Sequence, residues 1–182
     1  MLDFSKNYFE LFGLDSSYVV DNAQLSARYR ELQRVVHPDR FAGASEQEQR
    51  LSMQSSTLIN QAYETLRDPV LRGHYLLGLH GIEVEHHAHQ QQHDPAFLME
   101  QMELREELAD ARSQPDPYTA ISNIMTGISK RINTLIGQLA ICLEEGEEAN
   151  FATAQALLTK MQFLKKLQQD AERIEAELDE RH

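Results

Sequence analysis

Apolar side chains recur at helical spacing along most of the chain, beginning with the segment that follows Asp21. There Leu25, Tyr29, Leu32 and Val36 are spaced by four, three and four residues, which places them on one face of a helix. The Asp21 side chain is suited to accept from the first free backbone N–H groups, so it is the expected N-cap. The pattern predicts an amphipathic helix that ends near Val36.

Three more helices are predicted near this one: one before it and two after it. A capping box of Ser45 and Glu48 opens the longest of them, which continues until the sequence "RDP". The stretch "NYFELFGL" is a short apolar helix closed by Gly13, and "DPVLRGHYLLGLHG" is another, with Pro69 in its first turn and Gly81 at its end. The apolar face of the long helix consists of Leu51, Ser55, Leu58, Ala62 and Leu66.

A second set of three helices follows residue 93. They are predicted from about 96 to 112, from 117 to about 143, and from the acidic stretch "EEGEEAN" almost to the C-terminus. Apolar spacings in the last helix alternate between three and four, nearly as in a coiled coil, so this helix needs neighbours to bury its seam. The seam consists of Leu157, Met161, Leu164, Leu167, Ala171, Ile174 and Leu178. We expect an antiparallel three-helix bundle.

The predicted fold class is therefore all-α, with a four-helix domain over residues 1–79 and the bundle over residues 94–182. Residues 80–93 contain five of the eight histidines and three consecutive glutamines. They show no apolar periodicity, so they are interpreted as a linker.

Composition restricts the partners that the chain can have. The formal net charge of −12 argues against nucleic acid, because binding to phosphates needs a concentrated basic surface. Residues 1–75 carry 8 Lys and Arg against 10 Asp and Glu, a net of −2, whereas residues 76–182 carry 9 against 19, a net of −10. The acidic part is C-terminal, and the basic patch within residues 28–40 is local.

The single cysteine, Cys142, excludes an internal disulfide and a thiolate cluster built from this chain alone, which fits a reducing compartment. The N-terminal stretch has neither an apolar core nor an Arg-rich amphipathic pattern, so no leader peptide is expected. No apolar run approaches the roughly 20 residues of a membrane span. We expect a cytoplasmic protein that does not associate with a membrane and carries no cofactor.

The predicted helix that ends at Val36 leads into His37, Pro38 and Asp39. Proline alone would end a helix, because it lacks the backbone N–H and biases the preceding residue away from the α region. The histidine and the carboxylate therefore need another explanation. Four arginines lie beside them in the sequence: Arg28, Arg30, Arg34 and Arg40. A positive helix face that leads into a turn with an acceptor carboxylate indicates a contact with another protein.

Two other interpretations of this turn are kept. The arginines are solvated, as on most helices, or His37 and Asp39 act as an acid–base pair or as metal ligands. The second reading lacks support in the sequence, since no nucleophile or third ligand accompanies the pair. His86, His87, His89 and His93 in the linker are a further metal candidate, although an exposed tract is the simpler reading.

The order of short helix, basic helix, His-Pro-Asp turn, long helix and short helix resembles a J domain. The matching segments are "NYFELFGL", "RYRELQRVVHPDRF" and "INQAYETLRDPVLRGHYLL". The resemblance implies docking on a DnaK-like chaperone and stimulation of its ATPase by His37, Pro38, Asp39 and the arginine face, without enzymatic activity of the chain itself. The usual HPDK reads HPDR here, with Arg40 keeping the charge but not the donor geometry of lysine.

The first helix after the linker carries two apolar sectors. Helical geometry places them roughly 100° to 200° apart, and a helix at the edge of a bundle needs only one for its core. The core sector consists of Phe97, Leu104, Leu108 and Ala111. The second sector consists of Leu98, Met99, Met102 and Ala109, with Glu103, Arg105 and Glu106 along its border. Either the J domain covers the second sector, or it is an exposed patch for a protein partner.

The segment "FLMEQMELREELADA" resembles the C-terminal domain of the HscB family, the co-chaperones of iron–sulfur cluster assembly. This resemblance implies that the second sector holds the scaffold protein IscU and that the chaperone is of the HscA type. The residues implied in scaffold binding are Leu98, Met99, Met102, Glu103, Arg105, Glu106 and Phe163. Phe163 is included because it lies off the seam of its own helix, and Met102 stands where the family commonly has leucine.

A broader function remains open at this stage. A general J protein that serves DnaK with various apolar clients, or a structural helical module with an incidental turn, is also compatible with the pattern. Some relatives carry an N-terminal zinc-binding cysteine extension, which this sequence lacks.

Overall fold

The computed structural model describes residues 3–82, 94–144 and 148–180. Contacts between residues divide the chain into two compact units, Met1–Gly81 and Ile82–His182, and each is described by itself. The described residues form seven α-helices and one short 3₁₀ helix and contain no strand, so the predicted all-α fold is confirmed. Among the described helices, none combines the length and apolarity that crossing a membrane would require. The bounds predicted for the linker and the domains stay predictions, since residues 83–93 lie outside the described part.

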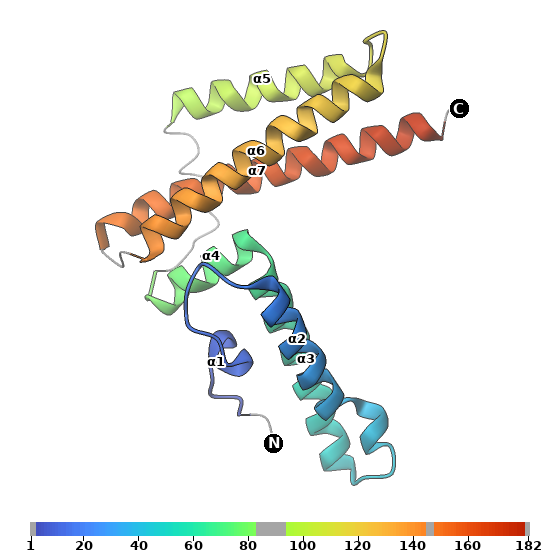
Figure 1. Cartoon of the computed structure of the whole chain (residues 1–182), viewed down its shortest axis with the longest axis vertical. Helices are drawn as coiled ribbons and strands as arrows, with labels where there is room; N and C mark the ends of the chain where they lie inside the picture. Colours follow the sequence, from blue (N-terminus) through green and yellow to red (C-terminus); the bar gives the residue numbers. More distant parts are fainter. Residues whose placement is uncertain (1–2, 83–93, 145–147, 181–182) are drawn as a thin grey trace. The chain divides into compact units, whose positions relative to one another are not determined.

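The N-terminal unit contains α1 (Tyr8–Phe12), α2 (Asn22–Val36), η1 (Pro38–Phe41), α3 (Glu46–Arg67) and α4 (Pro69–Leu79). Helices α2 and α3 lie side by side as a long hairpin, and η1 forms part of the connection between them (Figure 1). Fully buried side chains from all four α-helices form the core of this unit. They include Phe9, Phe12, Leu25, Ile59, Leu66 and Leu77. The four predicted N-terminal helices are therefore present.

Side-chain caps set the ends of these helices as the sequence predicts. The Asp21 carboxylate accepts from the backbone N–H groups of Ala23 and Gln24, so it satisfies donors that the first turn of α2 leaves free. Ser45 and Glu48 form the predicted reciprocal capping box at the start of α3. Gly13 ends α1 at a φ of 65°, in the left-handed region that glycine adopts without strain.

The C-terminal unit contains α5 (Pro95–Ala111), α6 (Pro117–Glu144) and α7 (Glu148–Asp179). Helices α6 and α7 form a long antiparallel pair, while the shorter α5 lies against one part of it (Figure 1). One apolar cluster joins the three helices. Its buried members are Phe97, Leu104, Leu108, Ala111, Ile121, Ile124, Ile128, Phe163, Leu164, Leu167, Ala171 and Ile174. The predicted core sector of α5 and the central part of the predicted seam of α7 are confirmed.

The core sector of α5 also includes Gln101, which the sequence analysis did not assign to it. The residue is 6% exposed, and its amide nitrogen has no hydrogen-bond partner among the described residues. The residue is four positions after Phe97 and three before Leu104, so its helical angle alone places it on the buried stripe. Gln101 was left out of the predicted core sector because it is polar, although its spacing alone would have assigned it there.

Phe163 is not part of an exposed patch, and that expectation was wrong. The side chain is 8% exposed and meets Phe97 edge-on, with ring centroids 5.9 Å apart and an interplanar angle of 89°. The residue does lie off the α7 seam, as predicted. Helix α5, however, covers that second face of α7, so an off-seam position is buried as deeply as the seam itself.

The two sectors of α5 are expected to respond differently to truncation. Leu104→Ala removes a side chain that is 7% exposed, and it should cost about 2–5 kcal/mol in the free energy of unfolding because a cavity remains in the core. Met102→Ala, on the same helix but 60% exposed, is the matched control and should cost less than about 0.5 kcal/mol. Denaturant unfolding of both variants is the measurement. Equal losses would contradict the division of α5 into a buried and an exposed sector.

Candidate partner-binding surfaces

The His-Pro-Asp turn is a compact hydrogen-bonded structure at the end of α2. His37 leaves the helical conformation, with φ −57° and ψ 127°, and Pro38 begins η1. The Asp39 backbone N–H donates to His37 Nδ1 at 3.3 Å, and the Arg40 backbone N–H donates to the His37 carbonyl at 3.0 Å. The histidine therefore caps the short helix that follows it, while the proline fixes the backbone between them.

The Asp39 carboxylate projects from this turn into solvent. Its side chain is 91% exposed, and the nearest basic atom is His37 Nδ1, 3.6 Å from one carboxylate oxygen. Because Nδ1 accepts the Asp39 N–H, it has no proton to offer the carboxylate, so the distance does not describe an ion pair. Both carboxylate oxygens are thus available to donors from another molecule.

Neither metal interpretation gains support from the described residues. Among them, no three His, Cys, Asp or Glu side chains are grouped as a metal ion would require. The imidazole Nδ1 of His37 already accepts a hydrogen bond from the backbone. The histidines of the linker, His86, His87, His89 and His93, lie outside the described residues, so their metal reading stays untested.

Arg40 ties the turn to the end of α2. One guanidinium N–H donates to the Arg34 carbonyl at 2.9 Å, and this carbonyl is among those that the last turn of a helix leaves without a partner. Arg40 also lines the open depression that includes His37. Arginine at this position can therefore support the backbone and still offer charge, because its planar fork has several donors.

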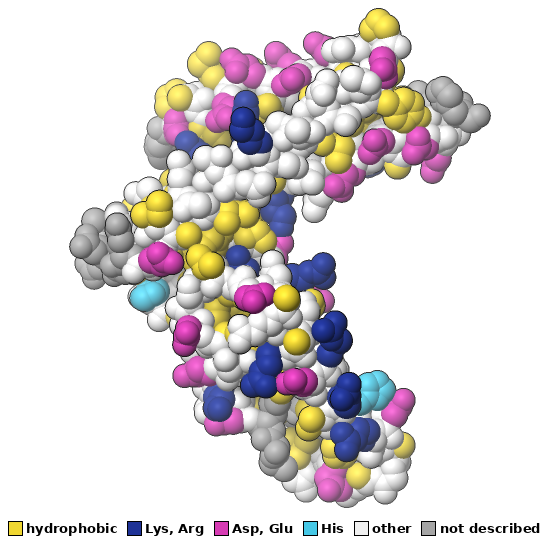
Figure 2. Space-filling view, in the orientation of Figure 1, with side chains coloured by type: hydrophobic (Ala, Val, Ile, Leu, Met, Phe, Trp, Pro, Cys, Tyr) yellow, Lys and Arg dark blue, Asp and Glu magenta, His cyan; other side chains and the backbone are white. Residues whose placement is uncertain are grey.

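A basic face lies along α2 next to the turn. Figure 2 shows dark-blue Lys and Arg side chains gathered over α2 beside a histidine. Among the described residues, the Arg30 and Arg34 side chains have no hydrogen-bond or ion-pair partner, so their charges are directed to solvent. An open depression joins this face to the turn, and its lining residues are Tyr29, Arg30, Gln33, Arg34, His37 and Arg40.

Two residues of this depression were not predicted to belong to a binding surface: Tyr29, which the sequence analysis places only on the apolar face of the helix, and Gln33. Tyr29 donates to the Asn60 side-chain oxygen on α3, and Gln33 donates to the same oxygen. Tyr29 also stacks on Tyr63, with ring centroids 4.1 Å apart. These contacts fix the wall of the depression to α3, so the arginines extend from a rigid support.

Arg28 does not belong to this face. Its Nε donates to the Phe12 carbonyl at 3.2 Å, where α1 ends, and its Nη1 pairs with the Glu31 carboxylate of α2 at 2.9 Å. A Cβ added to Gly13 would come within 3.0 Å of the same guanidinium. Arg28 therefore holds α1 against α2, on the opposite flank of α2 from Arg30 and Arg34.

An apolar hollow lies beside η1, with Phe41 in its lining. It lies between α2, η1 and α3, and Val35, 61% exposed, stands at its edge. Ser52 of α3 donates to the Val36 carbonyl at 2.6 Å and so closes the end of α2 beneath it. The lining residues are Leu32, Val35, Val36, Phe41, Glu48, Leu51, Ser52 and Ser55. The last turns of α2 thus contribute residues to both the basic depression and the apolar hollow.

The second sector of α5 is exposed. Leu98, Met99 and Met102 are 38%, 63% and 60% exposed, although large apolar side chains usually find cover. Figure 2 shows yellow apolar side chains on the outer surface of α5 between magenta acidic ones. The predicted neighbours Glu103 and Glu106 are exposed as well. An apolar strip with charged margins is typical of a protein-binding surface.

Arg105 marks the edge of this sector nearest α7. Its guanidinium carbon lies 5.2 Å from the centroid of the Phe163 ring, within the range of a cation–π contact. Arg105 is exposed, so the same side chain both packs on the aromatic pair and presents donors at the margin of the apolar strip. Of the residues expected in one patch, only Phe163 lies beneath the surface.

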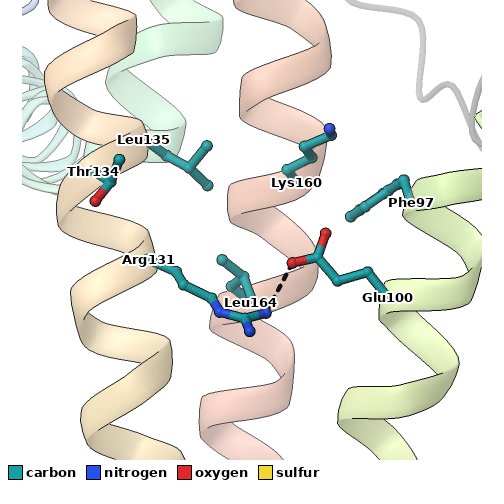
Figure 3. A pocket seen from close by; sticks show the side chains of 7 residues that line it. All are labelled: Phe97, Glu100, Arg131, Thr134, Leu135, Lys160 and Leu164. Atoms are coloured by element: carbon teal, nitrogen blue, oxygen red, sulfur yellow. Dashed lines mark hydrogen bonds and ion pairs between the residues drawn. The ribbon is translucent and has the colours of Figure 1, made fainter.

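A cleft opens on the other flank of α5, where that helix faces α6 and α7 (Figure 3). Arg131 of α6 pairs with Glu100 at 2.8 Å, and Lys160 of α7 lies 3.6 Å from the Asp94 carboxylate and 5.3 Å from the centroid of the Phe97 ring. The charges in this cleft are paired with one another. They therefore hold the N-terminal part of α5 in place and offer little free charge to a ligand.

Two family models match the chain. The model described as "DnaJ domain" matches residues 7–75, which include α1, α2, the turn, α3 and part of α4. The model described as "HSCB C-terminal oligomerisation domain" matches residues 93–172, which include α5, α6 and most of α7. The His-Pro-Asp turn with its basic face thus lies in the region matched by the first model, and the exposed sector of α5 lies in the region matched by the second.

Relatives of similar length match nearly the whole chain. A protein of Shewanella woodyi named "Co-chaperone protein HscB homolog" is 44% identical over 174 residues, which are 96% of this chain and 99% of that protein. The structure titled "Chaperone HscB from Vibrio cholerae" has a TM-score of 0.85 and 40% identity, and the match covers 95% of this chain and 99% of that one. Human co-chaperone protein HscB matches with a TM-score of 0.83 and 35% identity, covering 93% and 82%.

Proposed function

The chain belongs to the HscB family of J-domain co-chaperones, and on this premise we propose that it presents an IscU-type iron–sulfur scaffold to an HscA-type, DnaK-like chaperone. In this function it stimulates ATP hydrolysis by the chaperone. The observation that carries the proposal is the presence of two exposed surfaces of different chemistry on two separate units: a charged turn with a free carboxylate, and an apolar strip on α5.

The turn and the basic face are the proposed chaperone-docking surface. A turn already held by its own hydrogen bonds loses little conformational freedom on binding, which lowers the entropic cost of association. Arg30 and Arg34 supply long-range attraction to an acidic partner and orient its approach. Asp39 then accepts charge-assisted hydrogen bonds, which are stronger and more directional than neutral ones. Arg28 is left out of this surface because its Nε bonds the end of α1 and its Nη1 is paired with Glu31.

The exposed sector of α5 is the proposed scaffold-binding surface. Leu98, Met99 and Met102 provide apolar area that a partner can remove from water, and the methionine side chains adapt to an irregular partner surface. Glu103, Arg105 and Glu106 form a charged margin that favours one orientation of the partner. Phe163 is buried beneath this surface, where it packs against Phe97 of α5 and against the Arg105 guanidinium.

The steady-state ATPase rate of an HscA-type chaperone tests the function as a whole. We expect stimulation by this protein alone, stimulation by IscU alone, and a larger rate with both than the separate effects predict, since one molecule brings scaffold and chaperone together. Equal enhancement with unrelated apolar clients would identify the chain as a general J protein. Failure to stimulate the chaperone at all would refute the proposal.

Asp39→Asn should reduce ATPase stimulation by about tenfold or more, because the neutral amide loses charge-assisted hydrogen bonds worth roughly 1.5–3 kcal/mol. The melting temperature should stay near that of the wild type, since the carboxylate makes no ion pair within the described structure. Asp15→Asn, at an exposed site far along the chain from the turn, is the matched control and should stimulate normally. Wild-type stimulation by the Asp39 variant would show that the turn is not the docking site.

The double variant Arg30→Ala, Arg34→Ala should slow association with the chaperone by about tenfold at low salt and flatten its dependence on ionic strength. Stopped-flow association at several salt concentrations is the measurement. Arg28→Ala is the contrasting control: it should cost about 1 kcal/mol of stability through the lost bond to Phe12, yet leave the association rate near that of the wild type. If the double variant keeps the wild-type salt dependence, the face is merely solvated.

The triple variant Leu98→Ala, Met99→Ala, Met102→Ala should weaken IscU binding by about 2 kcal/mol or more if the three residues form the energetic centre of the interface. Unfolding free energy should change little, and basal stimulation of the chaperone should persist because the turn belongs to the other unit. Only the additional stimulation by IscU should disappear. A variant that melts as early as Leu104→Ala while IscU still binds would place these residues in the core and refute the assignment.

A further inference from the structure

Two methionines stand next to each other in the exposed sector of α5. Met99 and Met102 are three residues apart, so they lie on neighbouring turns of one helix face, and they are 63% and 60% exposed. Their thioether sulfur atoms are thus open to small solutes. Met161 of α7, by contrast, is fully buried in the same unit.

A thioether in such a position reacts with hydroperoxides. The sulfur lone pair attacks one oxygen of the peroxide, and an S–O bond forms as the O–O bond breaks. With hydrogen peroxide, the second oxygen leaves as hydroxide and takes the proton of the transferred oxygen, so it is released as water. The sulfur loses two electrons and the peroxide gains them, so no further reagent is needed. The product, methionine sulfoxide, carries a polar S=O group where the side chain had been apolar.

The consequence depends on where the methionine lies. A sulfoxide at an exposed site remains hydrated in the free protein, so the fold of α5 tolerates it. When a partner covers the same site, the S=O group must lose its water, and a buried polar group without a partner is costly. The penalty therefore falls on binding and leaves folding nearly unchanged.

We propose that Met99 and Met102 form an oxidation-sensitive switch in the scaffold-binding surface, so that hydroperoxides convert them to sulfoxides and release the iron–sulfur scaffold. This inference rests on the proposed function, because the switch acts through that surface. Reduction of the sulfoxides restores the thioethers and with them the apolar strip. The turn and the basic face contain no methionine, so chaperone docking persists after oxidation.

The chain offers a matched internal control. Met53 of α3 is 60% exposed, the same as Met102, but belongs to the other unit and lies outside the α5 sector. Its sulfur has equal access to peroxide, and its oxidation should leave scaffold binding unaffected. The effect of oxidising an exposed methionine can thus be compared, within one molecule, between a site inside the scaffold-binding surface and a site outside it.

The experiment uses the full chain with Cys142→Ala, so that the single thiol does not react, and two derivatives of it: Met99→Leu with Met102→Leu, and Met53→Leu. Each protein is treated with hydrogen peroxide, oxidation at each methionine is located by peptide mass spectrometry, and binding to cluster-free IscU is compared with the untreated sample of the same protein. One treated sample is then incubated with methionine sulfoxide reductases, and melting temperatures are recorded throughout.

We expect early oxidation at Met99, Met102 and Met53, with Met161 reacting last, and binding weakened about tenfold or more in the parent and in the Met53→Leu protein. The Met99→Leu, Met102→Leu protein should show no change relative to its own untreated sample. Reductase treatment should restore the parent. Bound IscU should slow oxidation at Met99 and Met102 but not at Met53.

Three results would overturn the switch. The first two are sulfoxides at Met99 and Met102 with unchanged affinity, and resistance of these two residues while Met53 oxidises. The third is a loss of binding together with a large drop in melting temperature, because damage to the fold would then be the cause. If untreated protein fails to bind IscU, the proposed function fails first, and this result is distinct from the others.

Discussion

The contact between α5 and α7 depends on an aromatic pair with a cation on each side. Phe97 of α5 and Phe163 of α7 meet edge-on, Lys160 of α7 lies over the Phe97 ring, and Arg105 of α5 lies over the Phe163 ring. Each helix therefore supplies one ring and the cation that covers the ring of its neighbour. Edge-to-face packing and cation–π attraction both depend on direction, so this arrangement favours one rotation of α5 about its axis.

The rotation of α5 decides which of its residues are available to a partner. With Phe97 directed at Phe163, the stripe through Leu104 and Leu108 is buried, and Met99 and Met102 are left on the outer surface. The pairs between Glu100 and Arg131 and between Asp94 and Lys160 hold the opposite flank. One helix thus serves as part of the core and as a binding surface, and its apolar exterior is a consequence of how its interior packs.

In the J-domain unit, too, the groups that stabilise the fold differ from the groups that are exposed to a partner. The apolar face of α2 packs on α3, and hydrogen bonds from Tyr29 and Gln33 to Asn60 strengthen that contact. The turn beyond α2 is closed by its own backbone and by Arg40, which leaves the Asp39 carboxylate unpaired in solvent. The charges that a partner meets therefore stand on a turn whose backbone is already hydrogen-bonded, and docking does not have to rebuild that turn.

Sequence by itself determined the elements and much of the site. Helix spacing, caps at Asp21 and Ser45, and the prolines and glycines at helix ends act between residues close in the chain, so they can be read without knowing the fold. The same local geometry separated the buried and exposed sectors of α5, because an angle about one helix axis follows from spacing alone. The same spacing also places Gln101 on the buried stripe, although its polar side chain kept it from being assigned there.

Tertiary structure decided which faces a second helix covers. Phe163 lies off the seam of α7, as its spacing indicates, but α5 passes over that face and buries it. Arg28 lies in the same basic segment as Arg30 and Arg34, yet its Nε donates to the carbonyl at the end of α1. Both outcomes depend on contacts between residues far apart in the sequence. Helical periodicity specifies an angle about one axis, whereas burial also depends on where the other axes lie, and that is set by the packing of the whole core.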